Sequence, residues 1–330
     1  MSWYEQRILE IEALDATKGG VPRHEYWRYE YYRNPYLLLV TDTELRQRFI
    51  DLHGNVVGLT EEGKIAPDPQ VFEKKDIIAS GWTQAVEALN ARGGLSQDLI
   101  SDANREISKY FESGLPPGVQ LFSGRPRILA NSVVKFSKRE FLEPMRNLGR
   151  IRLVPASFYS RGSLLKSMKD FELERMCRIP AVRDALRGET AIVYNGMRMP
   201  IEHGAITLTF DVANDYYLFS TCTELDRRMP TDFQADAALI IKDIAKFEFQ
   251  FKRAFLRQFG RSQIMGAAVR YYDPYRAIPT QTPPEFWKHF SYSYQKEYRL
   301  VARPMEASIS PDPVFLEIGS MEGYSEIVTT

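Results

Sequence analysis

Three separated segments in the second half of the chain carry side chains suited to chemistry on a charged dinucleotide. The segments are Arg150-Ile151-Arg152, Phe219 to Thr223 and Tyr294 to Val301. An arginine can bind a diphosphate through its planar guanidinium, and a serine or threonine hydroxyl can orient a sugar. A carboxylate can stabilise a developing oxocarbenium ion. These are the groups needed to cleave a glycosidic bond in such a molecule.

The third segment has the pattern of a strand, in which residues two apart share a face. We therefore expect Gln295, Glu297 and Arg299 to project together. Tyr298 and Leu300 would then face the opposite way. This arrangement places the carboxylate between an amide and a guanidinium.

The order of an arginine, a Ser-Thr strand and a Gln-x-Glu strand resembles the Arg–Ser–Glu class of ADP-ribosyltransferases, which transfer ADP-ribose from NAD. The resemblance implies an ADP-ribosyltransferase-like fold. It also implies that Arg152 or Arg150 holds the cofactor phosphates. Ser220, next to Thr221, would support the nicotinamide pocket.

By the same resemblance Glu297 is the catalytic carboxylate and Gln295 lies near an acceptor of unknown identity. The expected activity is ADP-ribosyl transfer or NAD cleavage, with NAD as the substrate. The chain departs from the pattern at Cys222, which replaces a third hydroxyl residue, and 77 positions separate Ser220 from Glu297. An inserted helix between these strands would account for that spacing.

Residues 125 to 325 are also similar to a widespread uncharacterised bacterial domain family. That family ends its domain in a Glu-x-Glu-aromatic-Arg-Leu strand, and Gln-Lys-Glu-Tyr-Arg-Leu occupies positions 295 to 300 here. This resemblance implies a bacterial origin and no particular activity.

A purely structural role for the same residues is the alternative. Glu297 and Arg299 could form a cross-strand charge pair on a solvated face, because charged strand faces are usually solvated. Ser220 and Thr221 could simply cap a strand. The sequence leaves both interpretations open.

A second alternative is a non-catalytic interaction module. The segment 125–187 contains 15 basic and 6 acidic residues. Four aromatic residues lie among these charges, as single-stranded nucleic acid or another phosphate-bearing partner would require: Phe136, Phe141, Phe158 and Tyr159. We favour the alternative in which the aromatics are core and the charges form a solvated face balanced by the acidic N-terminal half, because docking of the two halves would use the same electrostatics.

The segment Arg23 to Tyr36 interleaves tyrosines, Trp27 and arginines. It could stack on a ligand, but such residues are also favoured where one end is packed and the other is wet. We expect it at a seam between domains or at a homo-oligomer interface.

Composition removes several classes of function. The 330 residues contain 43 Lys plus Arg and 43 Asp plus Glu, so net charge gives no argument for a nucleic-acid or membrane partner. The apolar runs are far shorter than the ~20 residues that cross a bilayer. The first seven residues include an acid and no long apolar stretch, so we expect no signal peptide and no membrane partner.

Cysteines and histidines predict neither disulfides nor metal binding. Cys177 and Cys222 are too few for a disulfide framework or a cysteine-based zinc site, which predicts a cytoplasmic protein. The four histidines lie far apart in the chain. We expect Cys222 to be a buried structural thiol, and the carboxylates Asp170, Glu172 and Glu174 to belong to a salt-bridged surface.

The elements that position these residues follow from hydrophobic periodicity. Residues up to 115 contain 13 basic and 19 acidic residues, and the segment 113–118 is rich in Gly and Pro. We therefore predict a mainly helical region at 1–118 and an α+β domain with a mixed, mostly antiparallel sheet at 119–330. Expected helices are 96–111, capped by Ser96, then 83–92 and 247–259. Expected hairpins and strands are 55–60 with 64–65, 191–194 with 197–201, 206–212, 216–222, 238–242, 264–271, 296–302 and 314–318.

Overall fold

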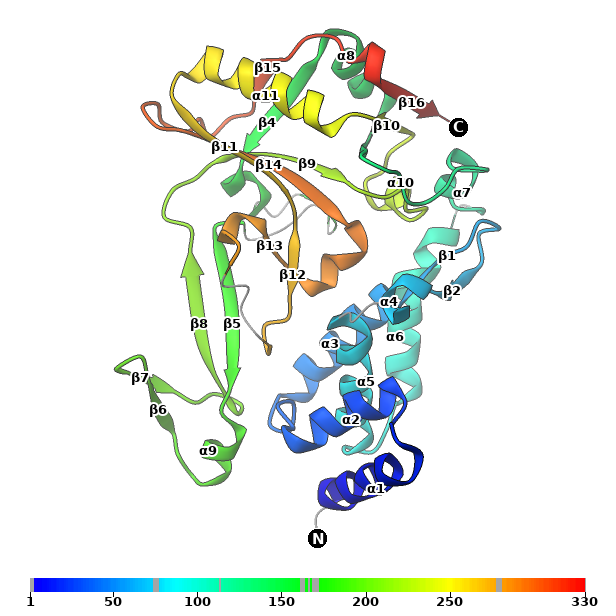
Figure 1. Ribbon diagram of the computed structural model, residues 1–330, viewed down its shortest axis with the longest axis vertical. Helices are drawn as coiled ribbons and strands as arrows, with labels where there is room; N and C mark the ends of the chain where they lie inside the picture. The colour runs from blue at the N-terminus through cyan, green and yellow to red at the C-terminus, as the bar shows by residue number, and fades with distance from the viewer. Residues whose placement is uncertain are drawn as a thin grey trace.

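The chain folds into an α+β structure in which helices come first and a large sheet follows (Figure 1). The computed structural model describes residues 3–73, 77–112, 114–160, 164–165, 167, 172–276 and 281–329. The helices of the N-terminal region are α1 Trp3–Lys18, α2 Arg23–Arg33, α3 Asp42–Val56, α4 Pro69–Glu73, α5 Ile77–Asn90, α6 Gln97–Ser108 and α7 Pro117–Leu121. A 3-10 turn, η1 Lys109–Phe111, extends α6. In the described part of the chain, no helix combines the length and apolar character that a bilayer span requires.

Local signals explain where these helices begin and end. The Ser96 side chain accepts a hydrogen bond from the Leu99 backbone N–H, which confirms the predicted cap of α6. Its predicted apolar face is buried at Leu99, Ala103 and Ile107. Helix α5 begins at Ile77, six residues before the predicted start, and ends before Gly93, whose φ of 106° suits glycine.

An eight-stranded sheet forms the second half, and every pair in it is antiparallel. Six strands lie in the order β11-β14-β9-β3-β10-β16, while β4 pairs with both β9 and β15. Their bounds are β3 Val133–Ser137, β4 Arg150–Pro155, β9 Tyr217–Cys222, β10 Ala237–Ile241, β11 Ser262–Ala268, β14 Glu297–Pro304, β15 Val314–Glu317 and β16 Ser325–Thr329.

The sheet splits along one edge of β9. Strand β14 pairs with the whole of β9 on one side, from Tyr217 to Cys222. On the other side β3 reaches only Cys222, and β4 reaches only Leu218 and Tyr217. Within the described part of the chain, residues 219–221 therefore have no strand partner on this edge. Helix α8, Arg139–Leu148, connects β3 to β4 across this gap.

Helix α11, Ile244–Phe259, covers one face of the sheet. The predicted four-residue repeat is confirmed, because Phe247, Phe251 and Phe255 are buried there and Gly260 ends the helix. Tyr298 and Leu300 pack against the same cluster, so Glu297 and Arg299 face the other side.

Shorter elements surround the sheet. The predicted hairpins form as β1 Val57–Leu59 with β2 Ile65–Pro67, and as β6 Ala191–Tyr194 with β7 Met197–Pro200. Asn195 and Gly196 have the positive φ values of a tight hairpin turn, 48° and 78°. The other elements are η2 Ala156–Ser160, β5 Glu174–Pro180, α9 Val182–Leu186, β8 Ala205–Asp211, α10 Met229–Asp232, β12 Arg270–Tyr272, η3 Pro284–Phe286, β13 Trp287–His289, η4 Phe290–Gln295 and η5 Glu322–Tyr324.

Two strand predictions need correction. The expected strand 264–271 is interrupted at Val269 and continues as β12, which pairs in parallel with β13. Gln295 belongs to η4, and Lys296 takes a left-handed φ of 44°, so β14 begins only at Glu297. The expected strand face thus contains Glu297 and Arg299 but not Gln295.

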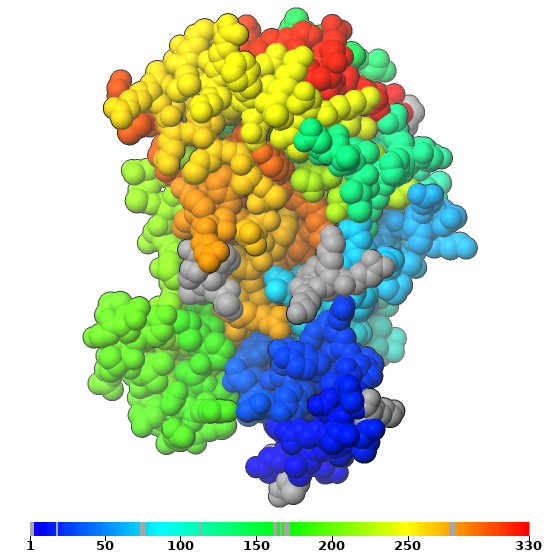
Figure 2. Space-filling view, in the orientation of Figure 1, coloured from blue at the N-terminus to red at the C-terminus, as the bar shows by residue number. Residues whose placement is uncertain are grey.

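Polar and aromatic side chains join the helical region to the rest of the chain. Arg48 of α3 forms a buried ion pair with Asp273, and the ring of Tyr36 lies 5.9 Å from that of Tyr275. Tyr36, one of the interleaved tyrosines, thus lies where the helical region contacts the rest of the chain. Figure 2 shows the arm built from β5 to β8, in green, beside the first helices in blue.

Candidate functional site

A cavity of about 650 Å³ opens at the gap between β3 and β4. That volume lies within the range of small-molecule sites. The three segments identified in the sequence meet at this cavity. All six predicted site residues line it: Arg150, Arg152, Ser220, Thr221, Gln295 and Glu297.

Glu297 lies buried at the inner end of the cavity, only 5% exposed. Its carboxylate accepts hydrogen bonds from Lys288 Nζ at 2.7 Å and from Arg299 Nε at 2.8 Å. Burial alone would raise the pKa of Glu297, but the charges of Arg299 and Lys288 outweigh burial and hold it well below its usual range. Gln295 Oε1 accepts from the same Lys288 ammonium at 2.9 Å, so it lies beside Glu297 although it precedes the strand.

Arg299 extends this network away from the cavity. Its side chain is fully buried, and its two terminal nitrogens each donate to the Glu172 carboxylate at 2.7 Å. Glu172 also accepts from Arg175 Nη2 at 2.7 Å. We call these five residues, Glu172, Arg175, Lys288, Glu297 and Arg299, the charged floor.

The charged floor corrects two sequence expectations. Glu297 and Arg299 do form an ion pair, but within one strand and buried, whereas their cross-strand neighbours are Cys222 and Ser220. The expected salt-bridged surface is also wrong for Glu172, which is 2% exposed. Glu174 begins β5, and Asp170 lies outside the described residues.

Three cations line the outer part of the cavity, and we call them the gap cations: Lys135, Arg150 and Arg152. Among the described residues none of them forms an ion pair with a carboxylate. Instead each lies over an aromatic ring, at 5.0 Å for Lys135 on Phe219. Arg150 lies 4.3 Å from the Phe315 ring centroid and Arg152 5.4 Å from that of Phe158.

Ser220 is the middle residue of the unpaired segment of β9. Its backbone carbonyl accepts a hydrogen bond from Lys135 Nζ at 2.8 Å. In an antiparallel strand the N–H and C=O of one residue point to the same edge, so the Ser220 N–H is directed at the gap as well. Thr221 Oγ1 donates to the Tyr298 carbonyl at 3.1 Å. Both residues lie inside β9, so the capping interpretation is wrong.

Burial controls the titration of the other groups in the cavity wall. It lowers the pKa of Lys135, although the nearby Cys222 and Glu297 act in the opposite direction. Burial raises the pKa of the Cys222 thiol, which keeps it protonated, as a structural thiol should be. Burial also raises the pKa of Tyr159.

Seven of the twelve described basic residues in the segment 125–187 form ion pairs within the chain. Arg127 bonds to Asp68 of the N-terminal region at 2.8 Å, and also to Glu224 and Asp226. Among the aromatics, Phe136 is buried and stacks on Phe233, whereas the side chain of Phe141 is exposed. The gap cations, by contrast, line the cavity and have no carboxylate partner among the described residues.

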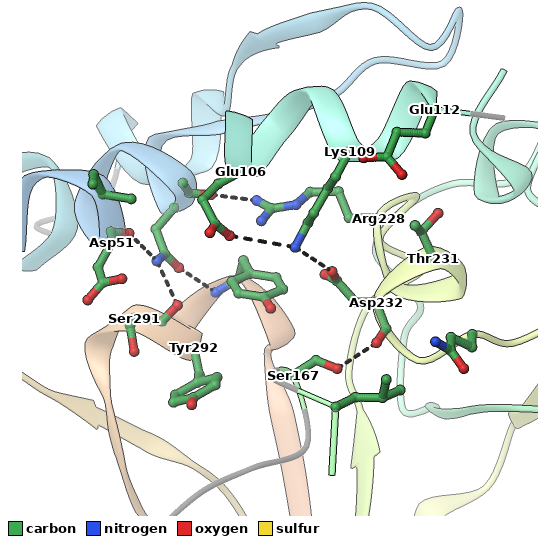
Figure 3. A pocket seen from close by; sticks show the side chains of 16 residues that line it. Asp51, Glu106, Lys109, Glu112, Ser167, Arg228, Thr231, Asp232, Ser291 and Tyr292 are labelled. Carbon is green, nitrogen blue, oxygen red and sulfur yellow. Dashed lines mark hydrogen bonds and ion pairs between the residues drawn. The ribbon is translucent and has the colours of Figure 1, made fainter. Parts of the chain in front are cut away.

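A second cavity, of about 340 Å³, lies between the N-terminal helices, α10 and η4 (Figure 3). Two of its charged side chains contact protein groups: Lys109 Nζ lies 3.3 Å from Asp232, and Arg228 donates to the Gly54 carbonyl at 2.6 Å. Ser167 lines both cavities, and its carbonyl accepts from Gln295 Nε2 at 2.8 Å.

Sequence analysis did not assign three charged residues of the cavity wall to the site: Lys135, Glu172 and Lys288. Nothing in their local sequence marks them, because their partners are distant in the chain or belong to the backbone. Glu172 and Arg299 are 127 positions apart. In the described part of the chain, no group of three or more His, Cys, Asp or Glu side chains is placed to hold a metal ion.

Comparisons of the chain with protein-family models, with curated proteins and with solved structures gave no match. The chemistry of the cavity is therefore the basis for a function.

Proposed function

We propose that the protein binds NAD in the cavity at the sheet gap and cleaves its nicotinamide–ribose bond, passing ADP-ribose to an acceptor or to water. One observation carries the proposal. A buried, ionised carboxylate, Glu297, and three gap cations line the same cavity of about 650 Å³, with Ser220 between them.

The charge of the cavity suits a diphosphate. Four basic side chains line it, Lys135, Arg150, Arg152 and Lys288, against three acidic ones, Glu140, Glu172 and Glu297. Arg175 and Arg299 lie outside the lining and pair with Glu172. Arg150 and Arg152 are two positions apart on β4, so both guanidinium groups project from one face. A planar guanidinium can bind phosphate oxygens through two parallel hydrogen bonds, which makes these residues the holders of the diphosphate.

Glu297 would supply the catalytic charge. Because its pKa lies well below the usual range, the carboxylate is ionised at neutral pH. A carboxylate has about four acceptor positions, and Lys288 and Arg299 occupy three of them at most, so one remains for a ribose hydroxyl. When the glycosidic C–N bond breaks, its electron pair leaves with nicotinamide and the negative charge stabilises the oxocarbenium ion.

The remaining residues would position the reactants. Ser220 would border the nicotinamide ring, and the aromatic side chains of the wall, including Phe219 and Phe233, offer surfaces for stacking. Gln295 would lie on the acceptor side, held there by Lys288 and by the Ser167 carbonyl. The acceptor or water loses a proton as it bonds to the ribose carbon.

Release of nicotinamide from NAD by the purified protein tests this proposal. Glu297→Gln keeps the size of the side chain and removes its charge, so we expect release to fall at least about a hundredfold. The matched control is Glu174→Gln, which alters an exposed carboxylate on β5 and should release nicotinamide normally. If the wild-type protein neither releases nicotinamide nor gains thermal stability with NAD, the proposal is wrong.

A further inference from the structure

Two lysines reach the cavity, and their partners differ. Lys288 Nζ donates to the Glu297 carboxylate at 2.7 Å and to Gln295 at 2.9 Å. Lys135 Nζ donates to the neutral Ser220 carbonyl and lies over the Phe219 ring. Lys135 forms no ion pair with a described carboxylate. The first lysine contacts a carboxylate, whereas the described contacts of the second are a neutral carbonyl and an aromatic ring.

The surroundings of Lys135 lower the pKa of its amine. The side chain lies in the wall of the gap, where burial disfavours charge and the positive charge of Arg152 adds to that effect. Glu297 and Cys222 face it from β14 and β9 and act in the other direction, but burial is the larger influence. A neutral amine in a partly apolar pocket is the nucleophilic form of lysine, the form that reacts with carbonyl compounds.

We propose that Lys135 forms a reversible Schiff base with a phosphorylated aldehyde that binds in this cavity. Arg150 and Arg152 would bind its phosphate, because both guanidinium groups line the cavity with Lys135 and have no described carboxylate partner. The unpaired edge of β9 at Ser220 leaves room for the carbonyl carbon beside the amine.

The reaction is balanced without any other reagent. The lone pair of the Lys135 amine adds to the carbonyl carbon, and the carbonyl oxygen leaves as water with the two protons of the amine. A C=N bond replaces the C=O bond, with no oxidation or reduction, and water reverses the step. The inference does not depend on NAD cleavage, although ring-opened ADP-ribose would belong to the same class of ligand.

Pyridoxal 5′-phosphate is a suitable probe, because it carries an aldehyde and a phosphate on one ring. The protein is incubated with the probe at neutral pH, and borohydride then reduces the imine to a stable secondary amine. Peptide mapping by mass spectrometry gives the labelling rate of each lysine. A lowered pKa gives more neutral amine at neutral pH, and Arg150 and Arg152 would hold the phosphate of the probe beside Lys135. We therefore expect Lys135 to be labelled at least about ten times faster than Lys138, which is exposed and lies 3.9 Å from Asp236.

Further measurements test whether the reactive amine is Lys135 and whether the phosphate of the probe binds beside it. Lys288, which is equally close to the cavity but ion-paired, should stay unlabelled, and inorganic pyrophosphate should slow the labelling of Lys135. Lys135→Arg retains the positive charge but cannot form an imine, so it should lose the imine absorbance while the protein stays folded.

Equal labelling of Lys135 and Lys138 would overturn the inference, and so would an imine absorbance unchanged in Lys135→Arg. The labelling rates of Lys135 and Lys138 in the wild-type protein are sufficient for the first comparison, even if Lys135→Arg fails to fold. Fast labelling of Lys135 in a protein that releases no nicotinamide from NAD would support this inference and reject only the proposed NAD cleavage.

Discussion

The charged floor and the gap cations meet at one cavity, but their charged groups have different kinds of partner. In the charged floor every ionised group contacts a group of opposite sign, and Arg299 alone contacts two carboxylates. Arg150 and Arg152 in the gap are exposed and contact aromatic rings instead. Buried charges must be paired for the chain to fold, whereas exposed cations remain hydrated until a ligand arrives. The comparison assigns stability chiefly to the charged floor and ligand binding to the gap.

Removing the central cation of the charged floor should have the largest effect. Arg299→Met leaves Glu172 and Glu297 buried with fewer partners, so the free energy of unfolding should fall by about 3–5 kcal/mol. Arg152→Gln should change it by less than about 0.5 kcal/mol, because that side chain is exposed. Denaturant titrations of both variants measure the difference. Equal losses would remove the distinction between the two regions.

Lowering the pH should destabilise the protein through His289, which follows Lys288 on β13. Burial lowers the pKa of His289 to about 4 from an ordinary value near 6.5, so between these pH values the unfolded chain binds the extra proton. The free energy of unfolding should therefore fall by about 2–3 kcal/mol as the pH drops from 6.5 to 4.

His289→Gln should remove this part of the pH dependence, and His24→Gln, which alters an exposed histidine, should leave it intact. Unfolding titrations at several pH values give the slopes. A slope unchanged in His289→Gln would show that other groups cause the acid sensitivity.

Neutralising a gap cation should weaken NAD binding with little effect on folding. Arg152→Gln removes a charged hydrogen bond to phosphate, so the dissociation constant should rise about tenfold, and the salt dependence of binding should decrease. Arg198→Gln on β7 alters an exposed arginine away from the cavity and serves as the control. Calorimetric titration measures both constants, and identical affinities would contradict the role of the gap.

A much smaller effect on stability than in the charged floor is expected at Lys135. Lys135→Met removes a cation that has no described carboxylate partner, so the free energy of unfolding should change by less than about 1 kcal/mol. Lys288→Met removes a partner of buried Glu297 and should cost several times more. The two variants share the residue type and the cavity. Similar losses would mean that Lys135 belongs to the charged floor.

Local patterns in the sequence predict much of the fold and little of the site. The Ser96 cap, the phenylalanine repeat of α11 and the Asn195-Gly196 turn each depend on neighbouring residues, and each prediction is confirmed. The left-handed backbone of Lys296 has no local signal, and it moved Gln295 off the expected strand.

The cavity itself depends on contacts between distant parts of the chain. The order of the three segments predicted that six residues would lie together, and all six line the cavity. The gap exists only because β3 and β4 meet opposite ends of β9. Glu172 could not be assigned from its neighbours, since its main partner, Arg299, lies in the last strand of the site. Strand register and long-range ion pairs are tertiary properties that a single sequence does not display.

Nicotinamide release measured over a range of NAD concentrations tests the central claim most directly. The division of roles predicts that Glu297→Gln lowers kcat at least about a hundredfold, whereas Arg152→Gln raises KM about tenfold and leaves kcat nearly unchanged. No release by the wild-type protein, or full release by Glu297→Gln, would contradict the account.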